Sequence, residues 1–127
     1  MRSVLKDMWN TPGVLKGSTG MPYVTSHYGY HMTLWHLPLA LSGQDADLPS
    51  GHLSFAPKIP APFELPLLLP GTWGLVSATV SAGGVTEYSV EVTTGATLVL
   101  STLEVAGAKF PGTATLAPGT PVTWKAQ

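Results

Sequence analysis

The sequence predicts an α+β protein, with an N-terminal helical segment followed by a small antiparallel β-sandwich. Two patterns divide the chain in this way. Apolar side chains recur at helical spacing in the N-terminal third, at Tyr28, Met32, Trp35 and Leu39. From Val76 to Val80, apolar and polar residues instead alternate strictly, which is typical of a half-buried strand. The length of 127 residues fits one domain, or one domain with an appendage.

The composition excludes several classes of protein. Charged residues make up 10% of the chain, and six basic residues against seven acidic ones give a net charge of −1. Such a balance does not suit binding to the phosphates of nucleic acid. The absence of cysteine excludes disulfides and thiolate chemistry. The apolar runs are far shorter than the roughly 20 residues of a membrane span, and the composition leaves the compartment open.

Residues 1–43 are predicted to be helical. A short helix is expected around Val4–Trp9 and a longer one near 26–42, ending at Gly43. Pro38 should kink or split the longer helix, because it removes a backbone hydrogen bond. The surface of this longer helix is apolar nearly all round, so the helix is expected to be buried against other elements.

Residues 44–72 are predicted to be an extended connector with few regular ladders. Prolines recur through it, at Pro57, Pro60, Pro62, Pro66 and Pro70. Each fixes its own φ and favours extended geometry at the preceding residue. A short strand is expected near 51–56, and the apolar run 63–69 should lie under cover.

Residues 73–127 are predicted to form the antiparallel β-domain. Glycine-containing turns at 83–84 and 94–95 separate the first alternating segments. The alternation changes parity between Leu100 and Leu103, which indicates a bulge or burial on both faces. Val122 and Trp124 belong to a last strand.

No residue pattern predicts catalytic or metal chemistry. His27 and His31 stand four residues apart on the expected helix and would face one ion. However, the first histidine is followed by Tyr28 instead of the glutamate of the usual helical zinc motif, so we predict neither metal nor another cofactor. The carboxylates show no spacing typical of a glycosidase pair.

Three segments of the chain resemble a known class of enzyme: HYGYHMTLWHLPLALSG, GHLSFAPKIP and PGTWG. They are similar to the end of the catalytic domain of (α/α)6-barrel glycoside hydrolases, most closely to glycoside hydrolase family 116, which includes non-lysosomal glucosylceramidase and β-glucosidases. The resemblance implies a C-terminal fragment whose helix near 26–42 closes the barrel. Such a fragment supports the parent enzyme and is inactive alone, because no position matches a catalytic carboxylate.

The same resemblance implies a sugar subsite and partners. Helix-end residues His27, Tyr28 and His31, together with Trp73, are the candidate substrate-binding residues. The expected partners are carbohydrate, bound by the parent enzyme, and the remainder of the barrel or another protein chain. A stand-alone β-sandwich that binds carbohydrate or protein is the alternative, with Trp73, Trp124 and Tyr88 as stacking candidates.

Overall fold

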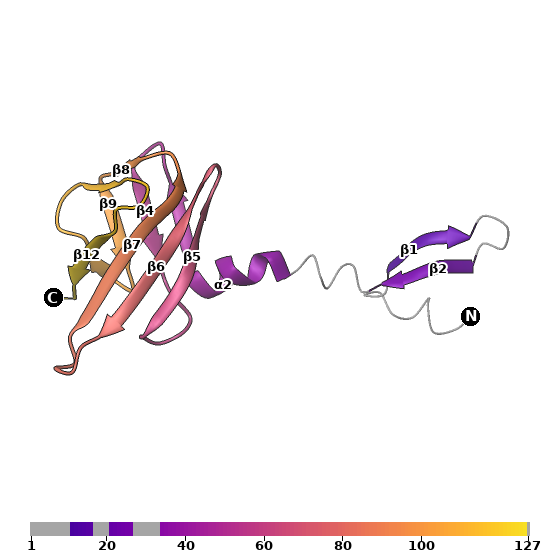
Figure 1. Cartoon of the computed structure of the whole chain (residues 1–127), viewed down its shortest axis with the longest axis horizontal. Coiled ribbons are helices and arrows are strands. Elements are labelled where there is room, and N and C mark those ends of the chain that lie inside the picture. Colours follow the sequence, from indigo (N-terminus) through magenta and orange to yellow (C-terminus); the bar gives the residue numbers. More distant parts are fainter. Residues whose placement is uncertain (1–10, 17–20, 27–33, 127) are drawn as a thin grey trace. The chain divides into compact units, whose positions relative to one another are not determined.

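The computed structural model describes residues 11–16, 21–26 and 34–126, which fall into two compact units, with the boundary in the sequence between Leu37 and Pro38. Strands β1 (Thr11–Lys16) and β2 (Met21–Ser26) form an antiparallel hairpin in the first unit (Figure 1). The second unit holds almost all of the described β-structure.

Two four-stranded sheets and one two-stranded sheet make up the second unit. The larger sheet has the order β12-β7-β6-β5, with β5 at Phe63–Leu69, β6 at Thr72–Val80, β7 at Thr86–Gly95 and β12 at Val122–Lys125. The smaller sheet has the order β10-β9-β4-β3, with β3 at Gln44–Asp47, β4 at His52–Phe55, β9 at Thr102–Val105 and β10 at Ala108–Lys109. Strands β8 (Leu98–Leu100) and β11 (Ala114–Leu116) pair with each other. The predicted β-rich domain is therefore present.

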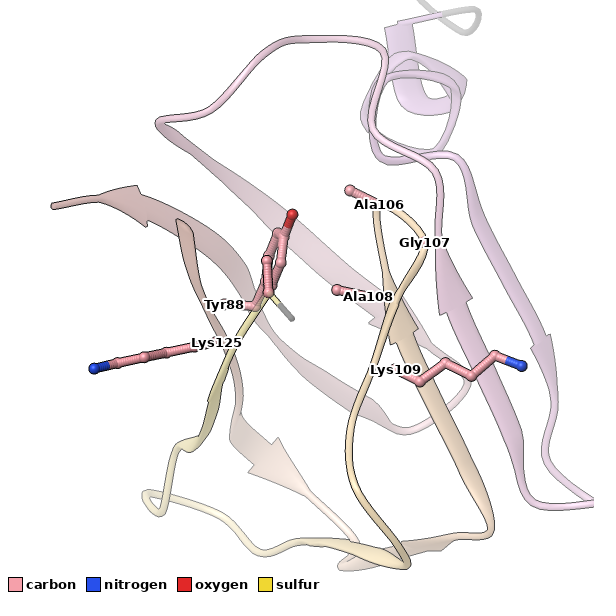
Figure 2. A pocket seen from close by; sticks show the side chains of 7 residues that line it. Tyr88, Ala106, Gly107, Ala108, Lys109 and Lys125 are labelled. Atoms are coloured by element: carbon pink, nitrogen blue, oxygen red, sulfur yellow. The ribbon is translucent and has the colours of Figure 1, made fainter. Parts of the chain in front are cut away.

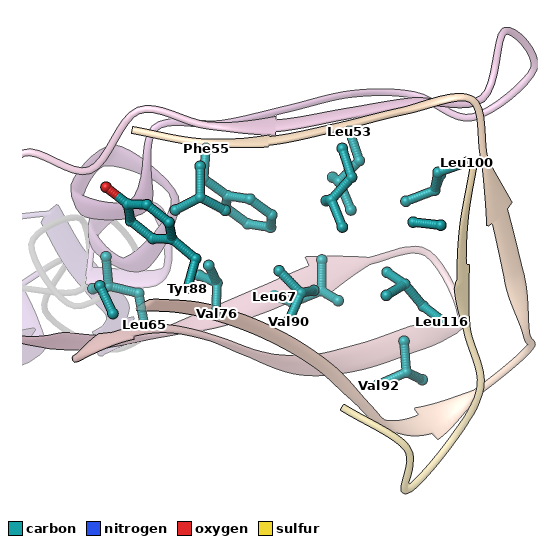
Figure 3. Packing of buried hydrophobic residues seen from close by; sticks show 14 of the residues in the cluster. Leu53, Phe55, Leu65, Leu67, Val76, Tyr88, Val90, Val92, Leu100 and Leu116 are labelled. Carbon is teal, nitrogen blue, oxygen red and sulfur yellow. The ribbon is translucent and has the colours of Figure 1, made fainter. Parts of the chain in front are cut away.

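One apolar core lies between the two larger sheets (Figure 3). Leu53 and Phe55 of β4 contribute from one sheet, and Leu67, Val76 and Val90 contribute from the other. Leu53, Leu67, Val76 and Val90 are all 0% exposed. Burying each such side chain stabilises the fold by about 1.5–3 kcal/mol, so this alternation holds the two layers together.

The change of parity near Leu100 has a topological cause. Strand β8 pairs with β11, whereas β9 pairs with β4 and β10, so the chain passes from one sheet to another at Ser101. The Ser101 hydroxyl donates to the Ser50 and Gly51 carbonyl oxygens at 3.0 and 3.1 Å, which anchors the crossing. The β4–β9 pair is parallel, and an isolated bridge between Val92 and Pro118 is parallel as well, so the prediction of purely antiparallel pairing is wrong.

The helical segment predicted for residues 1–43 is not what the structure shows. Strand β2 runs to Ser26, and the helix near 26–42 is reduced to a 3-10 turn η1 (Leu34–His36) and a six-residue helix α2 (Leu37–Ser42). Pro38 lies in the first turn of α2, where proline is tolerated because the first N–H groups have no partner in the helix. The helix expected at Val4–Trp9 and residues 27–33 lie outside the described part of the chain.

The predicted end of the helix at Gly43 is confirmed. The Gly43 N–H donates to the Leu39 carbonyl oxygen at 2.9 Å with φ at 55°, which is a left-handed helix termination. A Cβ at this position would lie 2.3 Å from the Ala56 carbonyl oxygen. Only glycine therefore fits both the backbone conformation and the close approach. In the described part of the chain, no helix has the length and apolar character needed to cross a membrane.

Residues 44–72 are not the predicted connector, because they contain β3, β4 and β5. The expected strand near 51–56 is confirmed as β4. Proline spacing misled the prediction, since proline is accommodated in edge strands when its nitrogen faces away from the ladder. Pro66 lies in β5, which is an edge strand, at such a position.

The free edge of β5 is closed by the side chain of Gln44 from β3. The Gln44 amide nitrogen donates to the Leu68 carbonyl oxygen at 2.7 Å, and the Leu68 N–H donates to the amide oxygen at 2.9 Å. The Gln44 side chain thus makes the same two hydrogen bonds to Leu68 that the backbone of a neighbouring strand would make. With Pro66 lacking an N–H, this contact protects the edge and ties the two sheets together.

We predict that Gln44→Met lowers the free energy of unfolding by about 1 kcal/mol, because it removes two hydrogen bonds while keeping the side-chain length. Chemical denaturation followed by circular dichroism measures the change. Asp45→Asn, at the exposed neighbour in β3, is the control and should alter stability by less than about 0.5 kcal/mol. Equal stability of Gln44→Met and the wild type would contradict the role of the contact.

Candidate functional site

The solvent side of the larger sheet, here called the outer face, carries the most prominent exposed aromatic side chain of the described residues. Alternate residues of each strand point to this side because the others fill the core. They are Glu64, Pro66 and Leu68 of β5, Trp73, Leu75, Ser77 and Thr79 of β6, and Glu87, Ser89 and Glu91 of β7.

Trp73 lies at one end of the outer face, among apolar neighbours. Its side chain is 59% exposed, and the strand register places it between Leu68 and Thr94. Leu68 and Leu75 are each 36% exposed. Leu68 is the register partner of Trp73, and Leu75 pairs with Pro66 one row further along the same face, so this end of the face combines an exposed aromatic ring with neighbouring apolar side chains.

A β-bulge fixes the strand at Trp73. Trp73 pairs with Thr94 while Gly74 pairs with Val92, which leaves Thr93 as the extra residue. The Thr93 hydroxyl donates to the Trp73 carbonyl oxygen at 3.1 Å. A Cβ on Gly74 would lie 1.9 Å from the Glu91 carbonyl oxygen, so the bulge requires glycine there.

Polar groups follow the apolar patch along the outer face. Glu91 pairs with Leu75, and one row further along Ser77 lies between Glu64 and Ser89. Within the described residues, the one salt bridge joins Lys109 and Glu104 on the other sheet. The carboxylates of the outer face therefore form no salt bridge within the described residues, and the strand register places them beside the hydroxyl groups of Ser77 and Ser89.

The predicted site residues differ in exposure, and three of them lie outside the described residues. Trp73 is exposed as a stacking residue must be, whereas His27, Tyr28 and His31 lie outside the described residues. Tyr88 and Trp124, the other stacking candidates, are each only 7% exposed.

The two buried rings have a structural role. Trp124 packs on Tyr88 and edge-on to Phe110, each with ring centroids 5.7 Å apart. Its indole N–H donates to the Ala108 carbonyl oxygen at 3.3 Å. Alternation along β7 and β12 is the sequence signal that places these rings inward, since Tyr88 and Trp124 are paired residues of neighbouring strands.

No protein-family model and no curated protein matches the chain. Over the described ranges, no three histidine or acidic side chains gather closely enough to hold a metal ion.

We predict that Gly74→Ala destabilises the domain by more than about 2 kcal/mol, because the new methyl group collides with the backbone of β7. Thermal unfolding measures this loss. Gly83→Ala is the matched control, since its Cβ would meet only the Ser81 hydroxyl at 4.0 Å. If the two variants unfold at the same temperature, Gly74 does not make the close approach described above.

Proposed function

We propose that the β-domain binds carbohydrate through its outer face, with Trp73 as the stacking residue, and that it serves as an accessory domain of a glycoside hydrolase. The observation that carries this proposal is the 59% exposure of Trp73 in strand β6, next to the β-bulge. A large aromatic side chain gains stability by burial, so its exposure on a rigid sheet favours a ligand that covers it.

The surroundings of Trp73 suit a sugar ring. A pyranose presents a C–H face that packs on an indole and a rim of hydroxyls that needs hydrogen-bond partners. Leu68 and Leu75 extend the apolar contact, while Glu91 and Ser77 supply acceptors and donors along the same strands. Apolar surface combined with a few placed polar groups is the usual composition of a small-molecule site.

The charge of the outer face favours neutral sugars. Glu64, Glu87 and Glu91 are acidic, and the one lysine at the edge of this face is Lys125, on β12. Carboxylates would repel uronates and sulfated sugars, whereas they accept hydrogen bonds from neutral hydroxyls. We therefore propose uncharged glucosides as the ligand class.

The link to a glycoside hydrolase rests on the resemblance of GHLSFAPKIP and PGTWG to that class. In this chain the first segment contains β4, whose Leu53 and Phe55 fill the core, and the second contains Trp73. A segment with a structural role and a segment on the sugar-binding face together support an accessory domain. The hydrolysis itself would be carried out by the parent enzyme.

We predict that Trp73→Ala weakens binding of cello-oligosaccharides or laminari-oligosaccharides at least tenfold, or about 1.4 kcal/mol, because the stacking surface is lost. Isothermal titration calorimetry measures the dissociation constant. Val99→Ala is the control, because Val99 is 65% exposed but lies on β8, outside the outer face. Unchanged binding by Trp73→Ala would refute the proposed site.

A second measurement separates carbohydrate from protein as the ligand. Light scattering after size exclusion gives the mass of the wild type and of Trp73→Ala. A monomer in both cases, together with sugar binding by the wild type, is the expected result. A dimer that Trp73→Ala dissociates would assign the outer face to protein contacts instead, in line with the alternative of an interaction module.

The accessory role is tested on the transcript. Sequencing upstream of Met1 should reveal a reading frame that continues into helical sequence with paired carboxylates. An in-frame stop codon directly before Met1 would contradict the glycoside hydrolase assignment while leaving sugar binding by the domain intact.

A further inference from the structure

A hollow in the outer face lies at the opposite end from Trp73, where β6 and β7 meet in their hairpin turn. This open cavity has a volume of about 220 Å³ and is lined by Thr79, Val80, Ser81, Val85, Glu87 and Lys125. Thr79 and Glu87 are register partners on the outer face, and Lys125 of β12 pairs with Glu87. Figure 2 shows a separate cavity beside the buried Tyr88 ring, and the Lys125 side chain extends away from it to the solvent side of the sheet.

The hairpin turn holds the walls of this hollow in place. The Ser81 N–H donates to the Val85 carbonyl oxygen at 3.0 Å, and the Val85 N–H donates to the Ser81 hydroxyl at 3.3 Å. The Gly84 N–H closes the turn on the Ser81 carbonyl oxygen at 2.9 Å. Walls fixed in this way lose little conformational freedom when a ligand enters, which favours binding.

The lining of the hollow combines an apolar wall with several polar groups. Val85 is 44% exposed, so it offers apolar surface to the C–H face of a sugar. The Ser81 hydroxyl accepts the Val85 N–H and keeps its own proton to donate, and Thr79 supplies a second hydroxyl. The one salt bridge of the described residues lies on the other sheet, so Glu87 and Lys125 are available to sugar hydroxyls as acceptor and donor.

The distance between the two ends of the outer face sets the size of the ligand. Trp73 and Thr79 stand six residues apart in β6, which corresponds to roughly 20 Å along a strand. Leu75 and Ser77 lie between them on the same face, and the outer residues of β7 run beside them. A single sugar ring does not reach from one end to the other, whereas a short chain of rings does.

We infer that the outer face binds an uncharged oligosaccharide chain along β6, with one ring on Trp73 and another in the hollow at Thr79 and Val85. The middle of the chain would lie over Leu75 and Ser77. This inference rests on the proposed sugar binding and adds the ligand class, because it requires a chain of rings rather than a single sugar or a disaccharide. Two contact points on one ligand give it a higher affinity than either contact alone.

Calorimetric titration of the full chain with ligands of different length tests this inference. We expect cellohexaose or laminarihexaose to bind at least about tenfold more tightly than the corresponding disaccharide. Equal affinity for the disaccharide and the hexasaccharide would overturn the inference and leave sugar binding at Trp73 intact. Absence of binding by either ligand would overturn sugar binding as well, so the two failures are distinguishable.

A double variant in the hollow assigns the gain to this end of the face. Thr79→Val with Glu87→Gln removes one hydroxyl and one charge at nearly constant volume. It should weaken the hexasaccharide at least about fivefold and leave the disaccharide unchanged, because only the longer ligand reaches the hollow. An unchanged affinity for the hexasaccharide, or equal weakening of both ligands, would overturn the second contact point.

The matched control makes the corresponding changes outside the outer face. Thr115→Val with Asp47→Asn alters an exposed residue of β11 and an exposed residue of β3. This control should bind both ligands as the wild type does, whereas Trp73→Ala should weaken both. Weakening of the hexasaccharide by the control to the same extent as by the double variant would show a general effect and refute the hollow as a binding site.

Discussion

The structure depends on the burial of β4 and β9 against the larger sheet. These two strands come from distant parts of the chain and pair in parallel, with Leu53 beside Leu103 and Phe55 beside Val105. All four side chains are at most 2% exposed. The opposite wall of the core, formed by β5, β6 and β7, presents the other half of the same apolar cluster. Neither sheet could bury its inner face alone, so the pairing of β4 with β9 also determines where the outer face lies.

The outer face and the cavity beside Tyr88 both follow from this arrangement. Alternation that sends Val76 and Val90 inward necessarily sends Trp73 and Glu91 outward, and this creates the outer face. The parallel ladder ends where the Ala106 N–H donates to the Phe55 carbonyl oxygen, and the tight turn that follows lines an open cavity beside Tyr88.

Local patterns predicted the strands better than they predicted the helices. Strands β4, β6, β7 and β12 were expected because their alternation has a period of two, which no helix reproduces. The apolar stripe from Tyr28 to Leu39 predicts a helix that is kinked or split at Pro38, whereas the structure begins α2 only at Leu37, with Pro38 in its first turn. The run 63–69 is apolar and contains Pro66, so its sequence does not distinguish a connector from an edge strand. The side chain of Gln44, 24 residues away, settles this by completing the edge of β5.

The sequence by itself determined the β-rich character of residues 73–127, the stop at Gly43 and the candidacy of Trp73. These depend on neighbours within a few residues, where alternation and glycine geometry act directly. Only the tertiary structure decided that Trp73 is exposed while Trp124 and Tyr88 are buried, and that Lys125 of β12 lines the same hollow as Glu87 of β7. The physical reason is that exposure and cross-strand neighbours depend on which strands pair, and the β4–β9 pairing joins segments about fifty residues apart.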